Sequence, residues 1–151
     1  MRMILTATIA ALLPLGAAAQ DDPVAQHVKA RQGYLQMLSV NMDTLSGMVR
    51  GTIDYDEDAA TTAATNIETL TGYDFPALFI EGSAQGEAEN SAARPDIWSD
   101  PEGFASKFSG LQEAAAGAGE AVQGGAENIG PVIQQLGGAC KACHDDYRAR
   151  S

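Results

Sequence analysis

The stretch Cys140-Lys141-Ala142-Cys143-His144 lies close to the C-terminal end of the sequence and carries the pattern C-x-x-C-H. This pattern is the attachment sequence for c-type haem, in which the two thiols add to the vinyl groups of the porphyrin. Residues three apart lie on one face of a helix, so both thiols can reach the same edge of the macrocycle. We therefore predict one covalent haem c per chain, bound through Cys140 and Cys143, with His144 as the axial ligand of the iron.

A C-x-x-C pair can also be a thiol redox centre or half of a zinc site. A redox pair is typical of a helix N-terminus that follows a strand in a βαβ pattern, and this sequence has no such pattern. A zinc site needs two further ligands, and His27 is the only other histidine or cysteine. The motif therefore favours haem attachment.

The position of the motif restricts the ligands of the iron. Only seven residues follow His144, and none of them is methionine or histidine. We therefore expect a sixth ligand to come from an upstream segment that covers the opposite face of the haem, or the iron to be five-coordinate.

Residues 1–19 have the features of a secretory signal peptide. Arg2 supplies the positive start, residues 4–13 form an apolar run, and alanines at 17–19 provide a cleavage site. The apolar run is too short to span a bilayer as a membrane anchor. We predict removal of residues 1–19 and a haem domain over 20–151, located in the periplasm, where haem attachment takes place.

The chain is acidic, with a formal net charge of −11 that becomes −12 once Arg2 is removed with the signal peptide. A surface of this charge repels nucleic acid and anionic membranes. We expect no nucleic-acid or membrane partner, and a redox partner, if there is one, with a basic docking surface.

Helical periodicity dominates the sequence, and no strand pattern is present. Apolar residues recur at three and four residue steps over 23–50 and 56–70, and again from 94 into an alanine-rich stretch that glycines break from 117 onward. A fourth helix runs from about 128 into the haem motif, and a loop is expected over 73–93. Four helices with mostly short connections predict an all-α antiparallel bundle.

Two motifs resemble those of the cytochrome c′ family, the high-spin, class II c-type cytochromes. The C-terminal C-K-A-C-H-x-x-Y-R ends at Arg148, and Arg31-Gln32-Gly33-Tyr34-Leu35 is similar to the R-Q-x-x-[ML] signature of the first helix. The stretch 93–98 is similar as well, and the likeness spans nearly the whole mature chain. The resemblance implies an up-down-up-down four-helix bundle with covalently attached haem.

The resemblance also implies roles for single residues. Arg31 and Gln32 would contact the haem propionates or the haem edge, and Leu35 would lie over the distal face, the side of the iron opposite His144. Arg148 would lie near the proximal side, and Trp98 would pack around the macrocycle.

Three further expectations follow from the same resemblance. Tyr34 would pack around the macrocycle together with Trp98. Ala92 stands in a stretch where some relatives have an acidic residue, which leaves a polar contact between that loop and the haem open. The family is commonly dimeric, and the homodimer surface would use residues of the first two helices, namely Tyr34, Met37, Met48 and Ile53.

A leucine cannot ligate iron, so Leu35 over the distal face implies a five-coordinate iron in an apolar site. Such a site disfavours the binding of dioxygen and disfavours the binding of NO and CO less. The resulting prediction is a periplasmic protein that binds NO or CO, transfers electrons, or does both, and is not an enzyme.

Two alternatives remain open. A low-spin electron carrier of the same fold would use Met37, Met42 or Met48 as a sixth ligand, although Met37 lies about 200° around the helix from Leu35. A haem peroxidase would need a distal acid–base residue, for which Arg31 and Gln32 are the only candidates.

Overall fold

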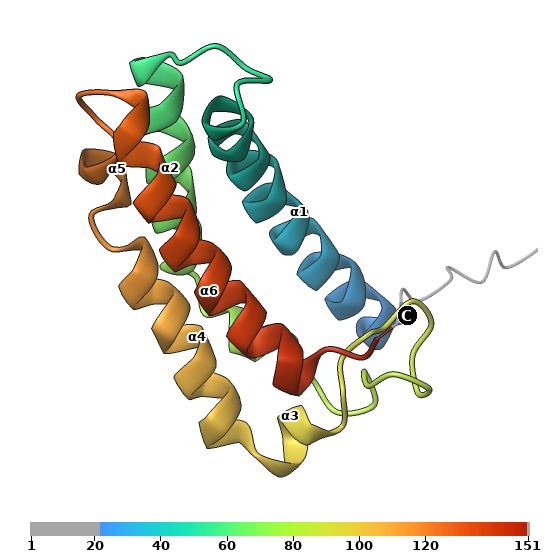
Figure 1. Ribbon diagram of the computed structural model, residues 1–151. Coiled ribbons are helices and arrows are strands. Elements are labelled where there is room, and N and C mark those ends of the chain that lie inside the picture. The colour runs from blue at the N-terminus through green and yellow to red at the C-terminus, as the bar shows by residue number, and fades with distance from the viewer. Residues whose placement is uncertain (1–21, 151) are drawn as a thin grey trace, which may run out of the picture.

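The computed structural model describes residues 22–150, so the predicted signal peptide lies outside the described residues. Four long helices run alternately up and down: α1 (Pro23–Val49), α2 (Glu57–Thr71), α4 (Pro101–Ala115) and α6 (Ile129–Tyr147) (Figure 1). Between residues 22 and 150 the only extended pairings are two isolated bridges. The prediction of an all-α antiparallel four-helix bundle is confirmed.

Aspartates begin three of the long helices. Asp22 accepts a hydrogen bond from the Val24 amide over 3.0 Å, and Asp56 accepts one from the Ala59 amide over 2.8 Å. Asp100 does the same for α4 through the Gly103 amide. An N-cap carboxylate satisfies a backbone donor that the first helical turn leaves free, and proline follows directly at the start of α1 and α4.

The predicted third helix is divided in the structure. The short helix α3 (Asp96–Ser99) ends at Asp100, whose φ and ψ of −135° and 65° are not helical. The following Pro101 disfavours the helical conformation at Asp100, so α4 has to start anew. After α4, Gly117 adopts a left-handed φ of 72° and separates the one-turn helix α5 (Ala118–Ala121) from it.

The bundle has an aliphatic end and an aromatic end. Leu45, Ile67, Ile129 and Leu136 are fully buried in the main core, where the alanines of α2 allow close helix packing. At the other end, a chain of ring contacts joins Tyr34 to Tyr147. This aromatic end holds the last turns of α6 and therefore the C-x-x-C-H motif.

The loop from Phe79 to Arg94 crosses the aromatic end of the bundle. It follows the short 3₁₀ helix η1 (Phe75–Leu78) and lies near the start of α1 and the end of α6 (Figure 1). A second 3₁₀ helix, η2 (Ala126–Asn128), leads into α6 at the aliphatic end. None of the helices within 22–150 is both long and apolar enough to cross a membrane.

Candidate haem site

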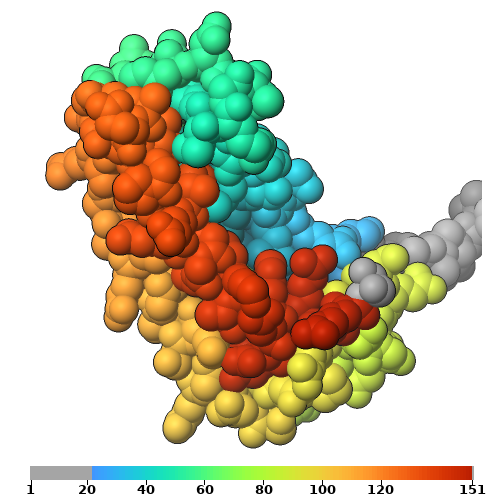
Figure 2. Space-filling model, in the orientation of Figure 1, coloured from blue at the N-terminus to red at the C-terminus, as the bar shows by residue number. Residues whose placement is uncertain are grey.

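A cavity of about 600 Å³ lies at the aromatic end, between α1, α4, α6 and the loop that precedes α3. In the space-filling view the surface is hollowed between α1 and α6 (Figure 2). The volume falls in the range of cofactor sites, about 300–1,000 Å³. Every site residue predicted from the sequence except Trp98 lines this cavity: Arg31, Gln32, Leu35, Cys140, Cys143, His144 and Arg148.

The two cysteines lie in the C-terminal half of α6 and are both partly buried. Burial raises the pKa of the Cys140 thiol and raises the pKa of Cys143 to about 11. Redox-active C-x-x-C pairs instead have lowered thiol pKa values and stand at helix N-termini. The structure therefore argues against a thiol redox centre and is compatible with two thiols that attach a haem covalently.

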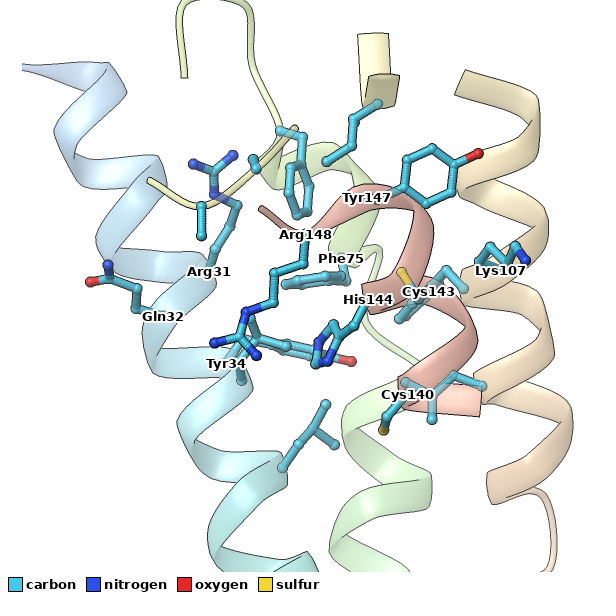
Figure 3. Close-up of a pocket in the computed structure, with 18 of the residues that line it drawn as sticks. Arg31, Gln32, Tyr34, Phe75, Lys107, Cys140, Cys143, His144, Tyr147 and Arg148 are labelled. Atoms are coloured by element: carbon cyan, nitrogen blue, oxygen red, sulfur yellow. The ribbon is translucent and has the colours of Figure 1, made fainter. Parts of the chain in front are cut away.

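His144 projects from α6 into the space that faces α1 (Figure 3). Partial burial lowers the pKa of its imidazole, and the positive charge of Arg148 lowers it further. The neutral imidazole is the form that binds a metal, so this environment suits an axial ligand. Among the described residues no cluster of three histidine, cysteine or acidic side chains could hold a zinc ion.

Arg31 is the one basic side chain among the described cavity residues that is buried, with 5% of its surface exposed. Its guanidinium donates to the Ser83 hydroxyl and to the Ser83 carbonyl, each over 3.0 Å, and lies 4.5 Å from the ring centroid of Phe79. Burial lowers its pKa, but an arginine stays charged at neutral pH. No carboxylate within residues 22–150 forms an ion pair with it.

A buried cation without an anionic partner fits a group that brings its own carboxylates. A haem carries two propionates, and Arg148 and Lys107 add two more cationic side chains to the cavity lining. Together with the thiols of Cys140 and Cys143 and the imidazole of His144, these residues fit a haem c.

Arg31 and Gln32 nevertheless point mainly to the loop. Gln32 donates a hydrogen bond from Nε2 to the Asn90 carbonyl over 2.9 Å. The guanidinium of Arg31 is turned toward the loop rather than toward His144 (Figure 3). A direct contact of either side chain with the haem stays a prediction.

Near the predicted distal position the cavity face of α1 carries the apolar side chains of Leu35 and Leu38, with Gln32 and Ser39 beside them. Leu35 lines the cavity and is 40% exposed, which leaves it at the mouth. Met37 is half exposed and does not line the cavity, as its position around the helix predicted. Met48 is buried in the main core, whereas Met42 does line the cavity.

The structure places Trp98 next to the cavity lining, and its packing around the macrocycle stays a prediction. Trp98 is not among the cavity-lining residues and lies behind Phe79, to whose carbonyl its indole nitrogen donates over 3.2 Å. Phe79 is the aromatic residue that reaches the cavity there. Tyr34 does line it, stacked on Phe75 with ring centroids 4.4 Å apart.

Several lining residues were not predicted from the sequence. Lys107 comes from α4 and pairs with Asp146 on α6 over 2.8 Å. Asn90 and Ser91 come from the loop. A basic residue within an amphipathic helix and two polar loop residues carry no signal that distinguishes them from ordinary surface positions.

Comparison with known proteins agrees with this geometry. The family model described as Cytochrome C' matches residues 26–148. A cytochrome c' of Cereibacter sphaeroides is 36% identical over 151 residues, which is 99% of each chain.

Solved structures agree as well. A cytochrome c' from Rhodobacter Spheriodes superimposes with a TM-score of 0.80 at 33% identity, covering 85% of this chain and 98% of that one. The nitric oxide complex of a cytochrome c prime variant from Alcaligenes xylosoxidans has a TM-score of 0.71 at 28% identity, covering 86% of this chain and 98% of that one.

Proposed function

The chain belongs to the cytochrome c′ family and binds haem c, and from this premise we propose that it is a periplasmic haem protein with five-coordinate iron. In this proposal Cys140 and Cys143 would hold the haem covalently, and His144 would ligate its iron. A bound haem would supply the iron at which NO or CO binds and through which an electron passes.

The apolar side chains that Leu35 and Leu38 present to the cavity are the observation that carries this proposal. The polar neighbours on the same face are bonded elsewhere, since Gln32 donates to the Asn90 carbonyl and Ser39 to the Asp43 carboxylate. Leu35 and Leu38 line the cavity there, and neither side chain can ligate iron or donate a hydrogen bond. Bound dioxygen needs a hydrogen-bond donor for its developing negative charge, whereas NO and CO depend on one much less. Leu35 has to move for a ligand to enter, which excludes large ligands.

A relative supports NO as the ligand. The cytochrome c prime variant from Alcaligenes xylosoxidans forms a nitric oxide complex on the same fold. Buffering or detoxification of NO, electron transfer, or both would suit a small periplasmic protein of this kind. The acidic surface favours a basic redox partner.

Titration of the reduced protein with NO, CO and dioxygen tests the proposal. We expect binding of NO and CO without a stable dioxygen complex, and no peroxidase turnover, because Arg31 and Gln32 are held by the loop instead of being free to move protons. Tight dioxygen binding would contradict the apolar distal face.

Met42 favours one alternative, a low-spin carrier with a methionine ligand, because it is the only methionine within residues 22–150 that lines the cavity. Met42 lies seven residues beyond Leu35, or about 10 Å along the helix axis, so the iron would have to lie nearer to Met42 than to Leu35 in this alternative. Replacement of Met42 by leucine separates the two proposals. The five-coordinate protein keeps its absorption spectrum, whereas a methionine-ligated protein loses its low-spin bands.

We also propose a homodimer, formed by an exposed apolar surface at α1 and the turn that follows it. Met37, Val40, Val49 and Ile53 are each at least 43% exposed. Tyr34 and Met48 do not belong to this surface, contrary to expectation, because both are buried in the core. Sedimentation of the wild type and of Val40→Glu tests the proposal: the wild type should be a dimer and the variant a monomer.

A further inference from the structure

The loop segment Ser83 to Arg94 contacts both helices that flank the haem cavity. On the side of α1, Arg31 donates to the hydroxyl and the carbonyl of Ser83, and more weakly to the Ser91 hydroxyl over 3.3 Å. Ser83 has no exposed surface, so these bonds are shielded from water. A buried guanidinium that makes three hydrogen bonds to two serines fixes the segment to α1.

Hydrogen bonds within the segment also join its two ends. The Ser91 hydroxyl donates to the Ser83 carbonyl over 2.7 Å, and the Gln85 amide donates to the Ala93 carbonyl over 2.8 Å. The Ser83 carbonyl therefore accepts from both Arg31 and Ser91. These bonds tie the position of residues 91–93 to that of Ser83.

On the side of α6 the segment pairs with the residues that follow the haem-binding motif. The Arg94 amide donates to the Tyr147 carbonyl over 3.0 Å, and the Ala149 amide donates to the Ala92 carbonyl over 2.8 Å. Both bonds join backbone groups, and they begin three residues after His144. The end of α6 is thereby fixed to the same segment that Arg31 holds from α1.

We propose that residues 83–94 form a strap that sets the separation of α1 and α6 at the mouth of the haem cavity, with Arg31, Ser83 and Ser91 as the positioning residues that close it. Asn90, Ser91 and Ala92 line the cavity as part of this strap. Because Leu35 is on α1 and His144 is on α6, the strap sets the gap between the distal gate and the axial ligand. The proposal does not depend on which small ligand binds.

Loss of one serine hydroxyl should loosen the strap locally. Removing the acceptor leaves a buried, charged N–H donor unsatisfied, which costs more than an ordinary surface hydrogen bond. Local opening of a protein is reported by amide exchange of the segment that opens. For Ser91→Ala we expect exchange in peptides covering 83–94 and 145–150 to rise about tenfold, equal to about 1.4 kcal/mol.

Two measurements on the holoprotein test this inference. One is hydrogen–deuterium exchange followed by mass spectrometry, and the other is the rate at which CO binds to the ferrous form. Ser83→Ala and Ser91→Ala should raise local exchange and speed CO association several-fold. Ser91→Thr keeps the hydroxyl and should restore both values. Ser109→Ala, at an exposed position of α4, is the matched control and should change neither.

Three results would overturn the strap. The first is unchanged exchange in 83–94 and 145–150 for both alanine variants. The second is faster local exchange with an unchanged CO rate, because the strap would then not set the gap. The third is a uniform rise in exchange that includes the core peptide 60–70, since it would report general destabilisation.

Discussion

The hydroxyl of Tyr147 donates a hydrogen bond to the carboxylate of Asp100 over 2.9 Å. This bond joins the last residue of the haem-bearing helix to the N-cap of α4, since the other oxygen of Asp100 accepts from the Gly103 amide over 3.0 Å. A side chain at Gly103 would collide with both the Asp100 carboxylate and the Tyr147 hydroxyl. The three residues therefore fix the end of α6 against α4.

Tyr147→Phe should destabilise the holoprotein by about 1–2 kcal/mol, because it removes a hydrogen bond to a charged acceptor in a partly buried site. Asp100→Ala should cost more, since it also removes the helix cap. Denaturant unfolding measures both values. Equal destabilisation by the two single variants would contradict the conclusion that Asp100 both accepts from Tyr147 and caps α4.

Leu35→Ala should speed the association of NO and CO with the ferrous protein. In the proposed site Leu35 covers the distal face, and a shorter side chain at this cavity-lining position would not have to move for a ligand to enter. Met37→Ala is a matched control on the same helix, because Met37 is half exposed and does not line the cavity. Stopped-flow rates compare the three proteins, and an unchanged rate in Leu35→Ala would show that Leu35 is not the distal gate.

The burial of Tyr34 should make the free energy of unfolding fall with pH in the alkaline range. Burial raises its pKa to about 12 from an ordinary value of 10.0. The folded state therefore disfavours the ionised phenol, and stability that is fully present below pH 10 is lost as the pH rises to about 12. The loss attributable to this group reaches about 2 kcal/mol near pH 12.

Tyr34→Phe should unfold with a smaller dependence on pH in this window. Tyr73→Phe, which changes a half-exposed tyrosine, serves as the control and should follow the wild type. Chemical unfolding at pH values from 9 to 12 measures the difference between them. If the free energies of unfolding of wild type and Tyr34→Phe change with pH in the same way, the predicted contribution of Tyr34 is wrong.

The Cys140→Ser, Cys143→Ser double variant should be partly or wholly unfolded. The haem would fill a cavity of about 600 Å³ at one end of the bundle, so its loss removes the packing contacts made there. Calorimetry should find no cooperative transition comparable with that of the holoprotein. A transition that matches the holoprotein in temperature and enthalpy would contradict this prediction.

The four-helix architecture and the α6 part of the site could be predicted from the sequence because both depend on local patterns. Apolar periodicity marks the long helices, and the C-x-x-C-H motif lies within a single helix. The break at Asp100 was missed although Pro101 signals it, because the apolar pattern continues through Phe104 and Phe108.

The strap could not be predicted, since its bonds join residues far apart in the sequence. Arg31 and Ser83 are separated by 52 positions, and no periodic pattern marks residues 83–94. The same holds for Trp98, whose packing behind Phe79 depends on how the loop folds.

The coordination state of the iron tests the central claim most directly. Resonance Raman and absorption spectra of the isolated protein, in both the ferric and the ferrous form, should show a high-spin five-coordinate haem with His144 as the only axial ligand. Spectra of a six-coordinate low-spin haem in the absence of added ligand would contradict the account.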